Sequence, residues 1–374
     1  MIILMVSDSD LWLFGILAVN LLLNAFVLAR LAKAFRLLRF PADQTADGME
    51  LPTVSVCITA RNETHAMTQC LERVVATEYP KLEVIVLDDG SRDNTSMLIK
   101  SFAHAGVRFI EGTPLPEGWL GKNHAQAVLA REASGKLVFF LDVDTLIDRH
   151  TIRNAVTYML ANRAAMVSFI PIRHDQWHGS TILATMRYFW TVMRFSPERP
   201  RAAANAWLIE RDMLLERFGS DDTLPLSMEV ETTLARHASE HLRYRLVLSD
   251  RHLGLRYEKR WTSQVETSIR LLYPQCGKQW YQVAALVAVL LFALVPYAAL
   301  FVTPWALLGV VAQYGVAYYY LSHVWVRYRI IGALIVPVTL VQEAVLLVVS
   351  AYKYRHGIVT WKGRPITTGR GARS

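Results

Sequence analysis

Short apolar runs alternate with helical stretches from Val54 to Ile170, and this alternation limits the possible folds more than any other feature. The runs predict buried strands, and the stretches of about 10–15 residues between them predict helices. Successive strands joined through helices pair in parallel, with helices on both faces of the sheet. We therefore expect an α/β domain with a mostly parallel, doubly wound sheet. The expected strands are 54–60, 82–87, 107–110, 137–141 and 165–170, and the expected helices are 64–77, 93–105, 122–134 and 149–161.

The chain has more apolar residues than a soluble domain usually has, and the excess lies at its two ends. Hydrophobic residues make up 53% of its 374 residues, compared with about 45–50% in soluble domains. Leu11 to Ala29 carries no charge, and it is long enough to cross a hydrocarbon core of about 30 Å. A cleaved signal peptide would have basic residues before this run, whereas Asp8 and Asp10 precede it. The pattern favours an uncleaved anchor, with the following domain in the cytoplasm and a basic flank of Arg30, Lys33, Arg36 and Arg39.

The C-terminal apolar region predicts further membrane segments. Residues 283–322 are uncharged and are long enough for two crossings joined near Thr303. A further apolar stretch, 330–352, is interrupted by Gln342 and Glu343. A full crossing by this stretch would leave the basic tail outside, against the positive-inside tendency, whereas a re-entrant or interfacial segment would keep it inside. The sequence leaves both arrangements open.

These patterns divide the chain into five expected parts: an anchor with its basic flank (1–40), the α/β domain (41–254), an amphipathic helix (255–280), the C-terminal membrane segments (281–352) and a cytoplasmic tail (353–374). The amphipathic helix presents one apolar side, which predicts that it lies in the membrane interface or packs against the α/β domain. That side consists of Trp261, Val265, Ile269 and Leu272.

Charge and cysteine content exclude some classes of function. The net charge is +8, yet no Lys/Arg run alternates with aromatic residues in a recognisable nucleic-acid-binding module, so no nucleic-acid partner is expected. Basic residues gather beside the apolar segments instead, as expected for contact with anionic lipid headgroups. The spacing of Cys57, Cys70 and Cys276 matches neither a zinc site nor a disulfide framework, which predicts buried, reduced thiols.

Two pairs of carboxylates follow predicted strands, at the sheet edge where open α/β sheets bind ligands. Asp88 and Asp89 can accept hydrogen bonds from the base and ribose of a nucleoside, and Gly90 permits a tight turn there. A plain loop cap is the alternative, because Asp-Gly is common in turns. Asp142 and Asp144 offer hard oxygen ligands that suit Mg²⁺ or Mn²⁺ together with a diphosphate. Helix capping is the alternative for this second pair.

A third segment, Gly118–Lys122, opens a predicted helix between the two acidic strand ends. The free amide groups of a helix N-terminus attract anions, and Lys122 adds a positive charge suited to phosphates. His124 lies just inside the same helix, where an ordinary helix residue is the simpler interpretation. The acidic and basic segments together predict a pocket for a nucleotide diphosphate and a divalent cation.

Taken together, these segments resemble the family 2 glycosyltransferases of the GT-A fold. Thr59–Glu63 is similar to the family's first-strand nucleotide segment, which implies nucleotide contacts by Ala60, Arg61 and Glu63. Asp88–Ser91 is similar to the nucleoside motif, with Asp88 and Asp89 as contacts, and Asp142–Asp144 to the DxD metal motif. The resemblance implies that Asp144 and Asp142 hold Mn²⁺ or Mg²⁺, and that Asp142 and Lys122 also contact the nucleotide.

Gly118–Lys122 and the terminal segment Trp361–Arg364 narrow the resemblance to membrane-anchored members near the hopanoid-associated, carotenoid-type and ceramide glycosyltransferases. This implies a Rossmann-like GT-A domain between an N-terminal transmembrane helix and a C-terminal transmembrane region. It implies a nucleotide-sugar donor, expected to be a UDP-sugar, and a lipid or polyprenoid-like acceptor. The expected location is the inner membrane of the cell, as a multi-pass protein with a cytoplasmic catalytic domain.

The acidic motif expected for the catalytic base departs from the family pattern. Residues 228–236 read MEVETTLAR, where the family has Glu-Asp or Asp-Asp before a Leu-x-Arg helix. The resemblance implies that Glu231 is the base, with Val230 replacing the first acid and Glu229 as the second candidate. Solvated carboxylates on a helix are the alternative interpretation of both glutamates.

Residues 257–261 retain only Arg260 and Trp261 of the Gln-x-x-Arg-Trp motif of the processive enzymes, which argues against polymer synthesis. The resemblance implies that Arg260, Trp261, Trp361 and Arg364 close over the diphosphate and the acceptor. An interfacial anchor is the alternative for the last two residues.

The sequence thus predicts a metal-dependent, inverting glycosyltransferase that acts on a lipid hydroxyl group. A catalytically impaired membrane-assembly or lipid-binding module and a nucleotidyltransferase are the two competing hypotheses. The prediction requires Asp89 and Asp144 to lie on the same side of the domain, around one cation.

Overall fold

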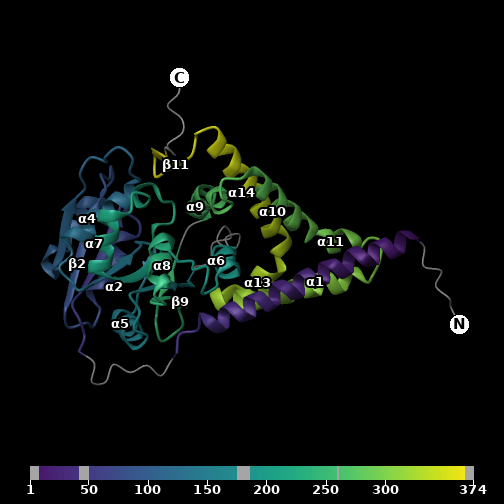
Figure 1. Cartoon of the computed structure of the whole chain (residues 1–374), viewed down its shortest axis with the longest axis horizontal. Helices are drawn as coiled ribbons and strands as arrows, with labels where there is room; N and C mark the ends of the chain where they lie inside the picture. The colour runs from purple at the N-terminus through teal and green to yellow at the C-terminus, as the bar shows by residue number, and fades with distance from the viewer. Residues whose placement is uncertain (1–7, 42–49, 175–185, 259–260, 367–374) are drawn as a thin grey trace. The chain divides into compact units, whose positions relative to one another are not determined.

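A computed structural model describes residues 8–41, 50–174, 186–258 and 261–366 (Figure 1). Its contacts divide the chain into two compact units. The described residues of unit 1 fall within 1–36, 176–193 and 260–359, and those of unit 2 fall within 37–175, 194–259 and 360–374. Each unit is therefore assembled from three separate parts of the chain.

Unit 2 is built on a seven-stranded sheet with the strand order β3-β2-β1-β4-β8-β6-β9. Strand β1 lies between β2 and β4 and is parallel to both, β2 is parallel to β3, and β6 is parallel to β9. Only β8 is antiparallel to its neighbours, β4 and β6. The α/β fold with a mostly parallel sheet is therefore confirmed. The strands are β1 (Val54–Ala60), β2 (Leu82–Asp88), β3 (Val107–Glu111), β4 (Leu137–Leu141), β6 (Met166–Ile170), β8 (Ala206–Glu210) and β9 (Tyr244–Leu248).

All five predicted strands are present to within one residue at either end, whereas β8 and β9 were not predicted. The predicted strands are continuous apolar runs because helices cover both faces of the sheet, so period-2 alternation is absent. Val56 and Ile58 of β1 pack in one buried core with Leu71 of α2 (Met67–Val75) and Val156 of α5 (Thr151–Ala161).

The predicted helices of this domain are present but shorter than expected. The helix predicted at 93–105 becomes α3 (Thr95–Ser101) followed by a 3-10 turn at Ala103–Ala105. Asp93 instead accepts hydrogen bonds from the Thr64 hydroxyl at 2.6 Å and from the Thr95 amide at 3.1 Å. Such side-chain bonds compete with helical ones, which explains why α2 and α3 start late. The other helices are α4 (Gly121–Glu132), α7 (Arg211–Ser220) and α8 (Val230–Glu240).

Two small sheets complete unit 2. The first joins β5 (Thr145–Leu146), β10 (Arg256–Tyr257) and β7 (Ile172–Arg173). The second is an antiparallel hairpin of β11 (Thr360–Trp361) and β12 (Arg364–Pro365). Its two loop residues, Lys362 and Gly363, have φ angles of 46° and 76°, as a type I′ turn requires. The terminal segment singled out in the sequence is therefore a tight β-hairpin.

Unit 1 is helical. Its helices are α1 (Asp8–Leu37), α6 (Phe189–Arg194), α9 (Trp261–Gln275), α10 (Trp280–Phe292), α11 (Val295–Ala299), α12 (Ala306–Val324), α13 (Arg329–Leu334) and α14 (Val336–Arg355). Among the described residues, three helical segments are long and apolar enough to cross a membrane: Leu11–Leu37, Trp280–Ala299 and Val336–Arg355.

The predicted anchor is thus a candidate span, and the stretch whose fate the sequence left open provides another, Val336–Arg355. The second crossing expected within 283–322 corresponds to α12, which is not among the three candidates in the described parts of the chain. Helix α12 contains no Asp, Glu, Lys or Arg residue, and Gln313 and His323 are among its polar side chains.

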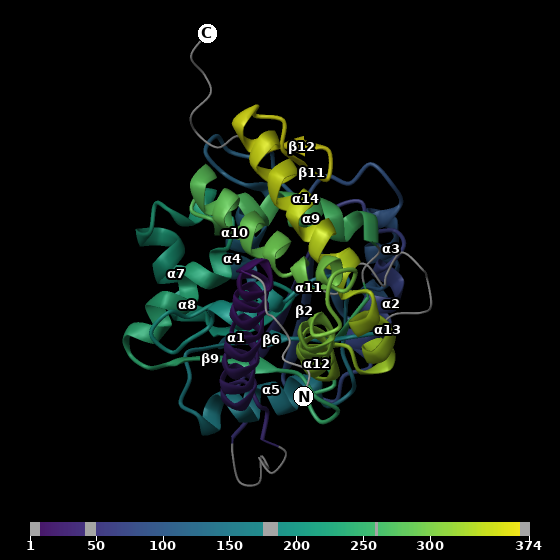
Figure 2. The ribbon, with the colours of Figure 1, turned by 90° about the vertical axis from the view of Figure 1, so that its right-hand side faces the viewer.

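Helix α9 runs beside α14 in unit 1 (Figure 2). Ser350 of α14 accepts a hydrogen bond from the Tyr273 amide at 3.0 Å, and the Tyr354 hydroxyl donates to the Arg270 carbonyl at 2.7 Å. Val265, Ile269 and Leu272 join one apolar cluster with side chains of α14. The apolar side of the amphipathic helix is therefore covered by a neighbouring helix, an arrangement that neither interpretation of the sequence included.

Candidate active site

The predicted site residues follow neighbouring strands at one edge of the large sheet. Ala60 of β1 pairs with Asp88 of β2, and Ile58 of β1 pairs with Leu141 of β4. Because the three strands are parallel, the residues that follow them emerge at the same carboxyl edge. Glu63, Asp89 and the pair Asp142 and Asp144 therefore start from adjacent positions on one side of the domain, as the interpretation of the sequence requires.

The two residues of the nucleoside motif have different environments. Asp88 accepts hydrogen bonds from the Ser91 amide at 3.2 Å and from the hydroxyl groups of Ser91 and Ser96, so it closes its own loop. Asp89 is 7% exposed, and its two carboxylate oxygens lie 3.0 and 2.7 Å from Nη1 of Arg364. The loop-cap alternative thus describes Asp88, while Asp89 is joined to the C-terminal hairpin.

The hairpin is held to this edge by both of its cationic residues. Arg364 binds Asp89, while Lys362 donates to the Glu63 carboxylate and to the Arg61 carbonyl, the latter at 3.1 Å. Arg61 donates to the carbonyl groups of Asp89 and Gly90, and the backbone carbonyl of Ala60 accepts from the Asp89 amide at 2.8 Å. Burial and the nearby Arg364 guanidinium lower the pKa of Arg61. This concentration of positive charge suits a diphosphate.

Gly121→Ala tests how closely these groups pack. A Cβ atom at Gly121 would lie 2.9 Å from Asp89 Oδ2 and 3.0 Å from Arg364 Nη1, so the ion pair would have to shift. We expect a destabilisation of about 1–3 kcal/mol, seen as a lower melting temperature, and weaker UDP binding. Gly219→Ala is the matched control, because it is also helical and its Cβ would meet nothing within 4 Å. Equal melting temperatures for the two variants would contradict this close packing.

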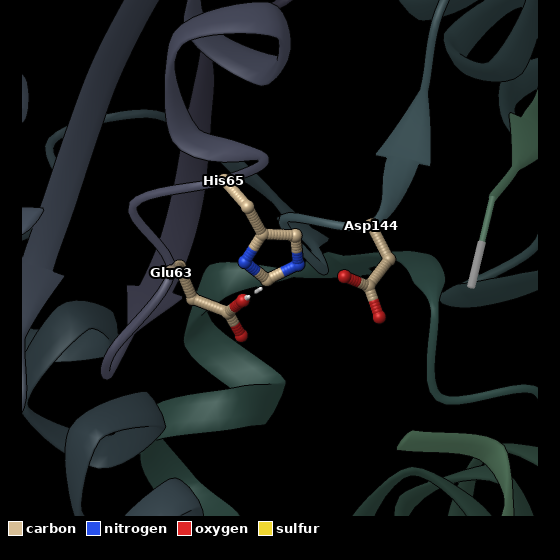
Figure 3. Close-up of side chains that lie close together, drawn as sticks. All are labelled: Glu63, His65 and Asp144. Carbon is tan, nitrogen blue, oxygen red and sulfur yellow. Dashed lines mark ion pairs between the residues drawn. The ribbon is translucent and has the colours of Figure 1, made fainter. Parts of the chain in front are cut away.

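Glu63, His65 and Asp144 form a group of potential metal ligands (Figure 3). One ligand atom from each lies within 4.8 Å of the others, and the imidazole lies between the two carboxyl groups. Nε2 of His65 is 3.9 Å from Oε2 of Glu63. Burial raises the pKa of Glu63, opposed by Lys362. Carboxylate and imidazole ligands from two loops fit a divalent cation such as Mn²⁺.

Asp142, which the resemblance paired with Asp144 as a metal ligand, is outside that group of described residues. Its Oδ1 instead accepts a hydrogen bond from Nζ of Lys122 at 2.8 Å. His65 was not predicted. Its signal in the sequence is the short spacing Glu63-x-His65 directly after the first strand, which places a second ligand type beside an expected nucleotide contact.

The two glutamates considered for the base also differ. Glu231 lies in the first turn of α8 and is 7% exposed. Burial raises its pKa to about 7, and the charge of Lys122 opposes this effect. Glu229 precedes the helix and lies 3.5 Å from the guanidinium of Arg201. A buried carboxyl group that titrates near neutral pH is suited to proton transfer, whereas the carboxylate of Glu229 is partly neutralised by Arg201.

Asn123 joins the first turn of α4 to the segment before α8. Its Nδ2 lies 2.9, 3.0 and 2.8 Å from the carbonyl oxygens of Leu224, Pro225 and Ser227. The Leu120 amide donates to Pro225 as well, at 2.9 Å. These bonds tie the turn that carries Lys122 to the loop that leads to Glu231. No pattern in the sequence marks Asn123 for this role.

The remaining predicted residues have other positions. His124 packs edge-on against Trp119, with ring centroids 5.6 Å apart, which fits an ordinary helix residue. Trp261 belongs to unit 1, where its indole donates to Oε1 of Gln342 at 3.1 Å. Arg260 lies outside the described residues. All three cysteines are buried and free, as predicted.

Known proteins match both the sequence and the fold. Residues 55–215 match the model of the family described as glycosyl transferase family 2. An N-acetylglucosaminyltransferase of Rhizobium leguminosarum bv. trifolii is 31% identical over 132 residues, which cover 34% of this chain and 72% of that protein. A poly-beta-1,6-N-acetyl-D-glucosamine synthase of Staphylococcus aureus (strain COL) is 33% identical over 114 residues, which cover 30% of this chain and only 26% of the synthase.

The mannosyltransferase PcManGT from Pyrobaculum calidifontis, solved in complex with GDP-Man and Mn²⁺, has a similar structure. The similarity has a TM-score of 0.56 and covers 91% of this chain and 97% of that chain. The sequence identity is 20%, so this comparison shows a shared fold.

Proposed function

This chain belongs to glycosyl transferase family 2, and on that premise we propose that it transfers a sugar from a UDP-sugar to a hydroxyl group of a lipid. The observation that carries the proposal is the gathering of complementary groups at one sheet edge. Asp89 follows β2 and Glu63 follows β1. Asp142 follows β4 and is bonded to Lys122 in the first turn of α4. The charges of this pair act on the buried carboxyl group of Glu231. A nucleotide diphosphate requires this combination of hydrogen-bond acceptors and cations.

In this proposal, the hydroxyl oxygen of the lipid attacks the anomeric carbon of the sugar and UDP leaves. Glu231 accepts the proton of that hydroxyl group. Its burial and its pKa of about 7 allow it to be deprotonated at neutral pH while remaining a sufficiently strong base. Lys122 interacts with both carboxyl groups, because it donates a hydrogen bond to Asp142 and its charge stabilises the ionised form of Glu231.

The residues proposed to contact the nucleotide sugar lie on or near the hairpin β11–β12 and the first turn of α4. Asp89 accepts hydrogen bonds from the nucleoside, together with the backbone near Ala60 and Asp88, while Glu63, which the resemblance also assigned to the nucleotide, is proposed as a ligand of the cation. Arg61, Lys122 and Arg364 supply positive charge for the diphosphate. We propose that Trp361 and Arg364 close over a bound donor, and the contacts of Lys362 with Glu63 and of Arg364 with Asp89 support this.

Asp144, with Glu63 and His65, would hold Mn²⁺ or Mg²⁺, which when bound neutralises the charge on the departing diphosphate. The mannosyltransferase of Pyrobaculum calidifontis, which shares this fold and was solved with Mn²⁺, supports this choice of cation. Asp142 then acts by positioning Lys122 rather than as a main ligand.

We further propose that unit 1 holds the protein in the inner membrane of the cell, with the α/β domain in the cytoplasm. Three candidate spans support the membrane location. The basic residues that follow the first span favour the cytoplasm for the next domain. We propose the same five-part division of the chain that its sequence predicts, with one difference: the hairpin β11–β12, expected in the tail, groups with the α/β domain.

A panel of nucleotide sugars tests the donor. Detergent-purified protein is heated with each sugar nucleotide, with and without Mn²⁺, and the melting temperature is measured. A ligand at 100 times its dissociation constant stabilises the folded state by about 2.7 kcal/mol. We expect one UDP-sugar to raise the melting temperature in a Mn²⁺-dependent way. A panel in which no nucleotide sugar stabilises the protein would contradict the proposal.

The product configuration tests the mechanism. A single base that activates the acceptor for direct attack inverts the anomeric centre, so an α-linked donor should yield a β-linked product. The anomeric coupling constant in a proton NMR spectrum of the glycolipid distinguishes the two configurations. A product with the donor's own configuration would rule out the role assigned to Glu231.

A further inference from the structure

Unit 1 contains an apolar cavity of about 240 Å³. It is bounded by α1, α6, α10, α12 and α14, and its lining includes Leu23, Val27, Phe189, Leu290, Ala317 and Leu340. The amide nitrogens that reach this cavity are bonded within the protein: Asn24 donates to the Asn20 carbonyl at 2.9 Å, and Gln313 to the Ala293 carbonyl at 3.0 Å. Oε1 of Gln313 is buried with no hydrogen-bond partner among the described residues. In a bilayer, a cavity of this character is suited to a hydrocarbon chain.

A smaller cavity of about 40 Å³, bounded by α6, α9 and α14, adjoins the apolar one. Met186 and Trp190 line both cavities, so they form a shared wall. The lining of the smaller cavity is mixed: beside Val265, Leu272 and Leu346 it includes the polar or charged side chains of Arg187, Gln264, Gln342 and Glu343, and the indole of Trp261. An apolar space beside a small one that carries polar groups matches the shape of an amphiphile.

Two neighbouring residues of α14 accept indole hydrogen bonds at the smaller cavity. Oε1 of Glu343 accepts from Nε1 of Trp190 at 2.7 Å, and Oε1 of Gln342 accepts from Nε1 of Trp261 at 3.1 Å. Glu343 is 5% exposed and lies inside the candidate span Val336–Arg355. An ionisable residue at such a position is costly and usually marks a binding site or a transport path.

The same cavity contains acceptors that have no donor. Across the described parts of the chain, the one hydrogen bond to the Glu343 carboxylate goes to Oε1, which leaves Oε2 without a donor. The Oε1 atom of Gln264, a residue only 6% exposed, is likewise buried with no hydrogen-bond partner among the described residues. Buried acceptors are usually satisfied, so a ligand with hydrogen-bond donors would suit the Gln264 oxygen and the neighbouring Glu343 carboxyl group.

We propose that unit 1 binds a neutral lipid whose chain fills the apolar cavity and whose hydroxyl or amide group donates to Glu343. The shared wall at Trp190 places chain and headgroup in adjoining spaces. Arg187 and Glu343 contribute one charge of each sign to the lining, which favours a neutral headgroup over a phosphate. The inference rests on the proposed function in that this lipid is the acceptor, with the group at Glu343 distinct from the hydroxyl that reacts.

A pair of photoreactive lipids tests the site in full-length protein reconstituted in nanodiscs. One is a long-chain diol, and the other has the same chain with both hydroxyls methylated, so it lacks donors. The hydrogen bond to Glu343 should favour the diol by about tenfold, with labelled peptides from α12 and α14. Equal labelling by the two lipids would overturn the proposal, and this comparison requires no variant.

Variants locate the two parts of the site. Glu343→Leu should remove the preference for the diol, and Ala317→Trp should lower the labelling by both lipids because it fills the apolar cavity. Val311→Trp, on the same helix as Ala317 but 58% exposed, is the control and should label like the wild type. Unchanged labelling in both cavity variants would overturn the proposal.

Donor binding separates this inference from the proposed function. The rise in melting temperature caused by the UDP-sugar reports on unit 2 and on correct folding of each variant. A variant that keeps this rise but loses diol labelling supports the lipid site. A protein that no nucleotide sugar stabilises, but that still prefers the diol, would refute the proposed function and leave the lipid site supported.

Discussion

Glu231→Gln is expected to lower kcat by about 10³-fold, within the 10²–10⁴-fold range typical of general base catalysis. The amide has nearly the same size as the carboxyl group but cannot accept the acceptor's proton. Binding of UDP, measured by calorimetry, should remain close to that of the wild type, because the proposed donor contacts lie on Asp89, Arg61 and Lys122. Retained turnover would remove Glu231 from the mechanism and would revive the hypothesis of an impaired enzyme.

Glu229→Gln is the matched control, because it makes the same chemical change two residues earlier in the chain. Glu229 lies beside Arg201 rather than in a buried pocket. We expect a modest effect on kcat, smaller by at least about tenfold than that of Glu231→Gln. A larger loss for Glu229→Gln would exchange the roles of the two glutamates.

Glu231→Gln should also change how the free energy of unfolding depends on pH. The pKa of Glu231 is raised by burial from 4.5 to about 7, and Lys122, Glu229 and Asp142 are the charged groups that act on it. A raised carboxyl pKa favours the folded state fully below pH 4.5, and this contribution is lost as the pH rises through about 7. Glutamine resembles the protonated form at every pH.

Glu231→Gln should therefore melt at a higher temperature than the wild type at pH 8, by an amount that corresponds to at most about 3 kcal/mol. The two proteins should melt together at pH 4. Measurements in EDTA keep metal binding out of the comparison. A difference that is equal at both pH values would show that Glu231 is not the group that titrates.

Asp144→Asn is the second change with a large expected effect. Asp144 is the member of the proposed metal group that follows β4, and its replacement removes a negatively charged ligand next to Glu63 and His65. We expect Mn²⁺ affinity, followed by the signal of free Mn²⁺ in electron paramagnetic resonance, to fall by about tenfold or more. We expect kcat to fall by about 10²–10³-fold, as when other electrostatic stabilisation is removed.

Two further variants make this result specific. Asp222→Asn removes the same charge from an exposed position and should leave Mn²⁺ affinity unchanged. Asp142→Asn should weaken Mn²⁺ binding less than Asp144→Asn, because the Asp142 carboxylate is bonded to Lys122. A greater loss for Asp142→Asn would restore the metal assignment that the DxD resemblance implied.

The sequence was sufficient to identify five of the seven strands of the large sheet and the edge that carries the candidate site. Strands covered on both faces are continuous apolar runs, so β1, β2 and β4 could be located to within a residue. The residues that follow them are necessarily at one edge, because parallel strands all point the same way. The sequence by itself therefore places Glu63, Asp89 and Asp144 on one side of the domain.

Strands β8 and β9 could not be predicted from the same pattern. They lie in the 171–254 region, where helices of varying length interrupt the alternation, and β8 joins the sheet antiparallel to β4 and β6. Strand β8 pairs with β4 across more than 60 residues of chain, and local periodicity does not encode such distant pairing.

Local patterns thus decided which segments are strands, where acidic residues leave them and which helices are apolar enough for a membrane. Only the tertiary structure decided which of these residues meet: Lys362 with Glu63, Arg364 with Asp89, and Lys122 with Asp142. Ion pairs between residues 20 to nearly 300 positions apart depend on the folded path of the chain. Burial is likewise a property of the folded state, and it alone distinguishes the raised pKa of Glu231 from an ordinary carboxyl group on a helix.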